Sequence, residues 1–219
     1  MKKIVLATTN KGKIAELKSF LSNFCKNYGF EVIGLDEVVG LGEIEENGNS
    51  FEENALIKAR VVAKYTGFIS IADDSGLMVD ALNGAPSIYS ARYADDIEKL
   101  PNESKDASCI RKLLMQMKGI NNRKAHFVCA MAIVSSNGQE LTVRGEWQGE
   151  ILDYPRGNNG FGYDPVFLDK STGKSVAELS RQEKSLKSHR AKALEKLLKQ
   201  LPDFIGSIKK VSNIKTFVF

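Results

Sequence analysis

The pattern of hydrophobic and polar positions predicts alternating strands and helices over the first third of the chain. Ile4, Val5 and Leu6 form a short apolar run typical of a buried strand. A polar loop follows, and the next apolar residues recur with helical spacing. The predicted elements are a strand at 2–8, a helix with Ile14, Leu17, Leu21 and Phe24 on one face, a strand at 31–35, a helix at 51–65 and a strand at 68–73. This order favours an α/β fold.

The remaining chain begins with a loop-rich stretch and continues with helix and hairpin patterns. Asn137 and Gly138 predict the tip of a hairpin. The predicted elements are a helix with Ile110, Leu113, Leu114 and Met117 that ends at Gly119, strands at 125–135 and 140–147, a short strand at 166–168, and a last helix with Leu194, Leu197 and Leu201. We expect one domain over residues 1–205. Residues 206–219 fit either an added edge strand or a partly ordered extension.

Two of the predicted helix starts carry the signature of a capping box. Ser50 and Ser180 are each followed three residues later by a glutamate, Glu53 and Glu183. Gly67 supplies a stop for the helix that begins after Ser50.

Composition and charge are those of an ordinary globular protein, with 42% hydrophobic and 26% charged residues. No apolar run could span a bilayer or form the core of a signal peptide, so we expect a cytoplasmic protein without a membrane partner. The three widely spaced cysteines predict buried free thiols. A net charge of +4 is a mild excess, and we expect no nucleic-acid partner.

Two adjacent aspartates, Asp73 and Asp74, stand at the predicted end of a strand. Side chains alternate between the two faces of a strand, so these carboxylates are expected to serve different purposes. One would serve the fold, and the other would take part in chemistry. Ligands of open α/β sheets bind at the carboxyl ends of strands, and magnesium prefers oxygen ligands. The acidic residues Glu43, Glu45 and Glu46 could supply a further ligand or form a solvated face.

Three other segments could hold a phosphorylated ligand that carries a ring. TTNKGK at 8–13 lies between a strand and a helix, where amides and lysines favour anions, or is simply a turn capped by its asparagine. In NNGFGYDP at 158–165, Phe161 or Tyr163 could stack on a planar ligand. EKSLKSHR at 183–190 could clamp a phosphate or a base edge, or form a solvated helix face. Together with the carboxylates, these segments indicate a site for a nucleoside triphosphate.

Six segments, in their order and spacing, resemble the inosine triphosphate pyrophosphatase family of non-canonical purine nucleotide pyrophosphatases. They are TTNKGK, EENGNSFEENALIKA, ADDSGL, GAPSIYSARY, GFGYDP and EKSLKSHR, and the resemblance covers about residues 3–201. It implies an elongated α/β fold with a mixed central sheet flanked by helices, and two lobes with a substrate groove between them. It also implies a homodimer that uses Mg²⁺ to hydrolyse ITP, dITP and XTP to the monophosphate and pyrophosphate.

The resemblance further implies roles for individual residues. Asp74 would bind magnesium together with Glu45 or its neighbour Glu46, and would accept the proton of the attacking water. Asp73 is left with a structural or supporting role. The residues expected to contact the substrate are Thr8, Thr9, Asn10, Lys11, Gly12, Lys13, Ser75, Phe161, Gly162, Tyr163, Asp164, Lys184, His189 and Arg190.

Base selection follows from hydrogen-bond chemistry. Hypoxanthine and xanthine present an acceptor oxygen at position 6, where adenine presents an amino donor. Donors from the amides of residues 161–164, or from Lys184, His189 or Arg190, would therefore disfavour adenine by about 10²-fold or more.

Three rival functions are compatible with parts of this pattern. A nucleotide- or RNA-binding module could use the same basic loops, but it would not need magnesium-ligating carboxylates. A phosphatase with an aspartyl intermediate usually has two aspartates separated by one residue, whereas Asp73 and Asp74 are adjacent. The third rival is a related pyrophosphatase that acts on modified pyrimidine triphosphates.

Overall fold

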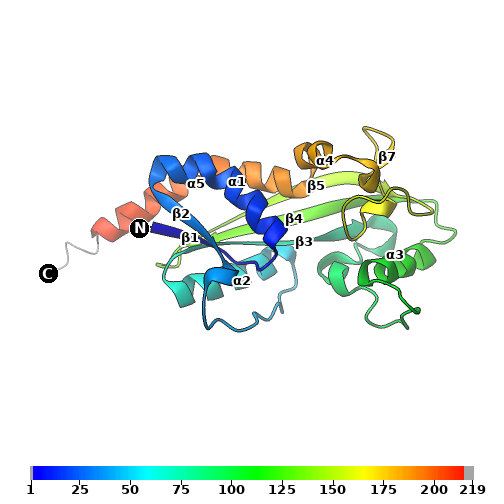
Figure 1. The fold of residues 1–219 in the computed structure, drawn as a ribbon, viewed down its shortest axis with the longest axis horizontal. Helices are drawn as coiled ribbons and strands as arrows, with labels where there is room; N and C mark the ends of the chain where they lie inside the picture. Colours follow the sequence, from blue (N-terminus) through cyan, green and yellow to red (C-terminus); the bar gives the residue numbers. More distant parts are fainter. Residues whose placement is uncertain (1, 215–219) are drawn as a thin grey trace. The chain divides into compact units, whose positions relative to one another are not determined.

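The computed structural model describes residues 2–214, and it describes side chains as far as residue 208. The helices and strands are drawn in Figure 1. They are, in chain order, β1 (Lys2–Leu6), α1 (Lys11–Tyr28), β2 (Phe30–Gly34), α2 (Phe51–Thr66), β3 (Ile69–Val79), α3 (Lys105–Gln116), β4 (Lys124–Val134), β5 (Glu140–Ile151), β6 (Phe167–Asp169), β7 (Lys174–Ser175), α4 (Arg181–Lys187) and α5 (His189–Ile214). No helix within these residues is both long enough and apolar enough to cross a membrane.

The strands form one seven-stranded mixed sheet in the order β2-β1-β3-β4-β5-β6-β7. Strand β1 runs parallel to both β2 and β3, and Leu6 stands opposite Gly34 and Ile71. Strands β5, β6 and β7 pair antiparallel. The predicted α/β class, with a mixed sheet flanked by helices, is therefore confirmed.

The chain divides into two compact units. Unit 1 comprises the described residues within Met1–Asp74, Ala130–Arg144 and Leu194–Phe219, and unit 2 comprises Ser75–Cys129 and Gly145–Ala193. The boundaries fall inside β3, β4, β5 and α5, so these elements contribute residues to both units. The predicted substrate groove stays a prediction.

In unit 1, helices cover both faces of the parallel strands, with α1 on one side and α2 on the other (Figure 1). The predicted apolar face of α1 is buried as a whole. Helix α2 packs its alanines and Val62 against alternate strand residues such as Val5 and Ala72. Burial on both faces explains why these strands carry continuous apolar runs.

The core of unit 2 lies between α3 and the strands. Leu113 of α3 and Met117 at its C-cap are fully buried, together with Leu77 and Val79 from the second half of β3. The ring of Phe167 lies 4.3 Å from that of Phe127, measured between centroids. This core holds the framework from which the loops of unit 2 project.

Three cysteines are buried and free, as predicted, and the expected hairpin, final helix and capping box at Ser180 are confirmed. At Ser50 the box is only half formed. The Ser50 hydroxyl accepts from the N–H of Glu53 at 3.1 Å, but the Glu53 carboxylate accepts from the N–H of Asn49. Ser50 is thus the N-cap, but the Glu53 carboxylate accepts from the N–H of the residue before the N-cap and not from that of the N-cap itself.

Several element boundaries differ from the prediction by a few residues, among them the ends of β1, α3 and β5, and two differences are larger. Strand β3 does not end at residue 73 but continues to Val79. It can do so because the carboxylates inside it have partners, and because Leu77 and Val79 are buried in the core of unit 2. Helix α5 runs on through Pro202 to Ile214, so residues 206–214 are helical and form no edge strand. Residues 215–219 lie outside the described part of the chain.

Candidate active site

Asp73 and Asp74 point to opposite faces of β3. The Asp73 carboxylate accepts a hydrogen bond from Lys13 of α1 at 2.9 Å, and its side chain is 3% exposed. The Asp74 carboxylate accepts from the Asn54 amide of α2 at 3.0 Å, and it is half-buried. Because α1 and α2 cover opposite sides of the sheet, the two aspartates contact different helices, as the alternation of side chains along a strand predicts.

The loop before α1 brings its charges to the end of β1. The N–H of Ala7 donates to the Ile71 carbonyl at 2.8 Å, which sets the loop beside the part of β3 that carries the aspartates. Asn10 caps α1, and its side-chain oxygen accepts from the N–H groups of Gly12 and Lys13. Two amides expected to bind anions are therefore already satisfied by the cap, and the positive charge of Lys13 is the stronger anion-binding feature.

The remaining predicted residues of this loop are less buried. Thr9, Lys11 and Gly12 are exposed, and the half-buried Thr8 hydroxyl accepts from the N–H of Asn10 at 3.2 Å. The capped turn is compatible with an anion site, because the cap uses the Asn10 side chain and backbone amides and does not use the side chains of Lys11 and Lys13.

The acidic loop distinguishes its two adjacent glutamates. Glu46 accepts from the Lys58 ammonium at 2.8 Å, whereas Glu45 is exposed. Glu45 is therefore the residue with a carboxylate available for a cation. Within residues 2–208, no group of three or more histidine, cysteine or acidic side chains is assembled that could hold a metal by itself. A cation bound here would complete its coordination with water and ligand oxygens, as magnesium commonly does.

In unit 2, Asp164 organises the glycine-rich loop from inside. Its side chain is 4% exposed and accepts from the N–H of Phe161 at 3.0 Å and from the Lys184 ammonium. The same ammonium lies 4.6 Å above the centroid of the Phe161 ring. Phe161 is 64% exposed. An exposed ring held beneath a cation is a suitable platform for a flat ligand.

Tyr163 has a different position from its neighbour Phe161. It is 5% exposed, its hydroxyl donates to the Ser90 carbonyl at 2.8 Å, and burial raises the pKa of its phenol. The structure therefore favours Phe161 over Tyr163 as the stacking side chain. Ser90 in turn accepts from the N–H of Leu77 at 2.9 Å, which ties the loop to β3.

The amides of this loop are largely used within the protein. Besides the bond from Phe161, the N–H of Gly162 donates to Asp106 at 2.6 Å and the N–H of Asp164 to the Phe161 carbonyl at 3.3 Å. Three of the four amides expected to read a base edge thus already have acceptors. Side-chain donors, Lys184 first, are better placed for that role.

The last predicted residues lie at the start of α5. The His189 ring stacks on Phe127, with 5.0 Å between centroids, and Arg190 follows it in the first turn. Gly145 of β5 allows α5 to pack closely against this strand, because a Cβ at position 145 would collide with the backbone atoms of His189 and Ala193. Ser75 is half-buried in β3, next to Asp74.

Sequence reasoning missed several supporting residues: Asn54, Lys58, Ser90 and Asp106. Asn54 could have been suspected, since a polar residue within the apolar face of a predicted helix needs a buried partner. Lys58, Ser90 and Asp106 each form a hydrogen bond with a residue in a loop. The local sequence does not indicate such contacts.

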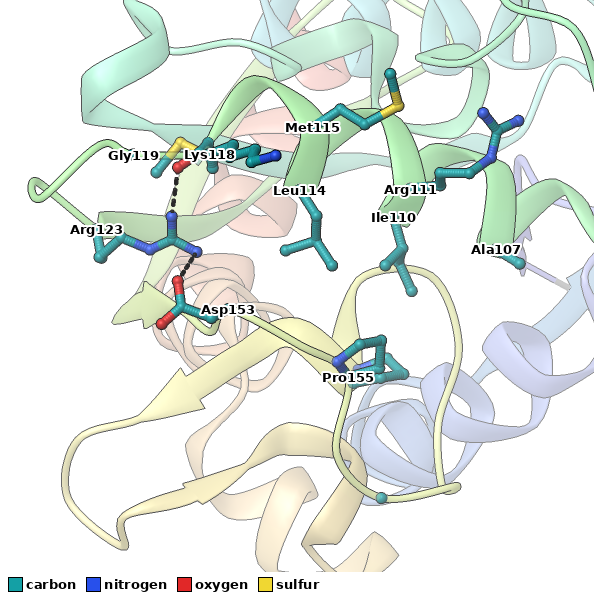
Figure 2. Close-up of a pocket in the computed structure, with 13 residues that line it drawn as sticks. Ala107, Ile110, Arg111, Leu114, Met115, Lys118, Gly119, Arg123, Asp153 and Pro155 are labelled. Atoms are coloured by element: carbon teal, nitrogen blue, oxygen red, sulfur yellow. Dashed lines mark hydrogen bonds and ion pairs between the residues drawn. The ribbon is translucent and has the colours of Figure 1, made fainter.

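A cavity of about 770 Å³ in unit 2 contains none of the predicted site residues (Figure 2). It lies between α3, with Ile110 and Leu114, and the segment around Pro155. Arg123 at its edge donates to the carbonyls of Met117 and Leu152 and pairs with Asp153 at 3.3 Å. The guanidinium of Arg123 therefore holds the fold together at this edge.

Comparison with known proteins decides the family. The model of the Ham1 family matches residues 4–200. The chain belongs to the Ham1 family. A dITP/XTP pyrophosphatase of Nitratidesulfovibrio vulgaris is 50% identical over 203 residues, which are 92% of this chain and 96% of that protein. One from Bacillus licheniformis is 47% identical over 199 residues, with 90% and 96% covered. The structure of the Staphylococcus aureus Ham1 protein has a TM-score of 0.82 at 40% identity and covers 92% of this chain and 99% of its own. The family recognised from the six segments is confirmed.

Proposed function

We propose that this chain hydrolyses the non-canonical purine nucleoside triphosphates ITP, dITP and XTP to the monophosphate and pyrophosphate. The observation that carries the proposal is the pair of aspartates on β3, one buried against Lys13 and one half-buried against Asn54. They occur in a chain that is 50% identical over 203 residues to a protein named dITP/XTP pyrophosphatase.

Lys13 would bind the leaving pyrophosphate. Its side chain is 26% exposed and its ammonium is held at 2.9 Å by the buried Asp73, so the cation is oriented before any ligand arrives. A triphosphate carries roughly four negative charges near neutral pH, and these must be compensated as charge develops on the leaving group. Asp73 is then a positioning residue for Lys13.

Asp74 and Glu45 are the oxygen ligands that fit Mg²⁺ in this unit. Both are carboxylates with exposed surface, and among the side chains described, residues 2–208, Glu45 has no cation partner of the kind that Lys58 provides for Glu46. Two carboxylates plus phosphate oxygens and water match the usual magnesium site. When bound, the metal would screen the phosphate charge and lower the pKa of water.

Asp74 would act as the base. Water attacks the α-phosphorus, its proton passes to a carboxylate oxygen of Asp74, and the bond from the α-phosphorus to the bridging oxygen breaks as pyrophosphate leaves. Asn54 donates to Oδ2 of Asp74 and so fixes the orientation of the carboxylate. The proton then passes from Asp74 to solvent.

Unit 2 would bind the base. The Phe161 ring stacks on the purine, and the Lys184 ammonium, fixed by Asp164, donates to the oxygen at position 6. An adenine amino group would face this donor and leave it without an acceptor, which costs about 10²-fold or more in selectivity.

The proposal is tested by incubating the protein with magnesium and each of ITP, XTP, dITP, ATP, GTP and dUTP, with pyrophosphate and orthophosphate assayed separately. We expect pyrophosphate from the first three. Orthophosphate as the direct product would reject this reaction in favour of a phosphatase. Binding without hydrolysis of any triphosphate would favour a nucleotide-binding module, and preference for dUTP would favour a pyrimidine enzyme.

We also propose a homodimer in the cytoplasm. Light scattering coupled to size-exclusion chromatography tests the first, and a mass of about 24 kDa, that of one 24.2 kDa chain, would contradict it.

A further inference from the structure

Asp106 holds the glycine-rich loop from outside. It lies in the first turn of α3, and its Oδ2 accepts the N–H of Gly162 at 2.6 Å across 56 residues of sequence. Its side chain is exposed, so burial does not force this contact. A bond from a backbone amide to a carboxylate is charge-assisted and is among the stronger hydrogen bonds in proteins.

Several contacts within the protein restrain the loop around Phe161. Gly160 and Gly162 both have positive φ, +79° and +59°. The loop wraps around the Asp164 carboxylate, and Tyr163 anchors it in the core. Phe161 projects between these anchors. The Asp106 contact is a further restraint on the backbone next to Phe161, and it comes from an exposed side chain on α3.

We propose that Asp106 is a positioning residue for base recognition, which fixes the Phe161 ring beneath the Lys184 ammonium by holding the amide of Gly162. This inference rests on the proposed function. In the proposed function Asp106 touches neither the phosphates nor the base, and it acts only through the loop.

The proposal predicts a specific kinetic pattern. Base-stacking groups contribute equally to binding in the ground state and the transition state, so losing their alignment raises KM and leaves kcat nearly unchanged. Asp106→Ala removes the acceptor, and we expect KM for dITP to rise about tenfold, with kcat within twofold. The preference for dITP over dATP should fall by a similar factor.

A second variant separates this role from a structural one. An acid in the first turn also stabilises α3 through the helix dipole. Asp106→Asn loses that charge but keeps an acceptor oxygen, so KM should stay within about threefold of wild type. If Asp106 served only the helix, Asn and Ala would behave alike. Asp95→Ala removes the same charge from an exposed position elsewhere in unit 2 and should leave KM unchanged.

The experiment measures kcat and KM for dITP and dATP in wild type and the three variants, and hydrogen–deuterium exchange of a peptide covering residues 157–164. Faster exchange and a raised KM in Asp106→Ala, both restored in Asp106→Asn, support the proposal. Unchanged exchange and KM in Asp106→Ala overturn it. A wild-type protein that does not hydrolyse dITP contradicts the proposed function instead, while the exchange data still decide whether Asp106 holds the loop.

Discussion

The ion pair between Lys13 and Asp73 should stabilise the fold in an asymmetric way. The ammonium and carboxylate lie 2.9 Å apart, with side chains 26% and 3% exposed. When Asp73 is neutralised, the lysine can turn toward solvent. When Lys13 is removed, the carboxylate stays buried and loses this counter-charge. We therefore expect Lys13→Met to destabilise the protein more than Asp73→Asn.

The magnitude follows from the geometry. Coulomb's law with an effective dielectric constant of about 20 gives roughly 6 kcal/mol at this distance, before the cost of desolvation. Removing one partner of a buried pair costs about 3–5 kcal/mol, and the partial exposure of Lys13 places Lys13→Met near 3 kcal/mol. Asp73→Asn keeps an acceptor oxygen and should cost about 1–2 kcal/mol. The coupling between the two sites should be about 2 kcal/mol.

The assay is urea unfolding of wild type, Lys13→Met, Asp73→Asn and the double variant, analysed as a double-mutant cycle. A difference of 1–2 kcal/mol between the single variants would also appear as a Tm difference of about 2–8 °C in a protein of this size. A coupling energy below about 0.5 kcal/mol, or a greater loss in Asp73→Asn than in Lys13→Met, would contradict a stabilising ion pair between Lys13 and the buried Asp73.

Three further predictions concern other sites. Burial would raise the pKa of Asp169, but hydrogen bonds from neighbouring side chains outweigh it and lower the pKa from 3.8 to about 2. This stabilisation is complete above about pH 4 and is lost as the pH falls toward 2. Between pH 5 and pH 2.5, the free energy of unfolding of wild type, measured with urea, should therefore fall by roughly 1.5 kcal/mol more than that of Asp169→Asn. Equal losses in the two proteins would contradict this prediction. In magnesium titrations of pyrophosphate release, Glu45→Gln should raise the half-saturating concentration by about tenfold or more and Glu46→Gln much less, whereas the reverse order would assign the ligand to Glu46. Gly160→Ala should raise KM for dITP about tenfold, because the new Cβ would strike a carboxylate of the same loop, while Gly173→Ala, also at positive φ but in open space, should not.

The amphipathic elements could be predicted from the sequence because their signals are local. The helical spacing of Ile14, Leu17, Leu21 and Phe24 corresponds to the buried face of α1. Ser50 and Ser180 mark helix starts because an N-cap acts over three residues.

The full length of β3 could not be predicted in this way. Two carboxylates in succession are costly in a buried strand unless partners compensate for them. The partners, Lys13 and Asn54, come from helices 60 and 20 residues earlier in the chain. Only the tertiary structure brings them together, and the strand then continues into the second core.

The candidate site shows the same limit. Alternation along a strand indicated that Asp73 and Asp74 differ, and the structure shows how, through α1 and α2. Neither the pairing of Glu46 with Lys58 nor that of Asp106 with Gly162 has a local signature. Both are contacts of loops, whose positions depend on the elements that flank them.

The most direct test of Asp74 as the catalytic base is the turnover of Asp74→Asn on dITP with magnesium, measured beside its affinity for the same nucleotide. The variant keeps the size of the side chain but cannot accept the proton of water. We predict that kcat for pyrophosphate release falls by about 10²-fold or more while the Kd for dITP, measured by calorimetry, changes by less than about fivefold. A kcat within tenfold of wild type would contradict the assignment of Asp74 as the base.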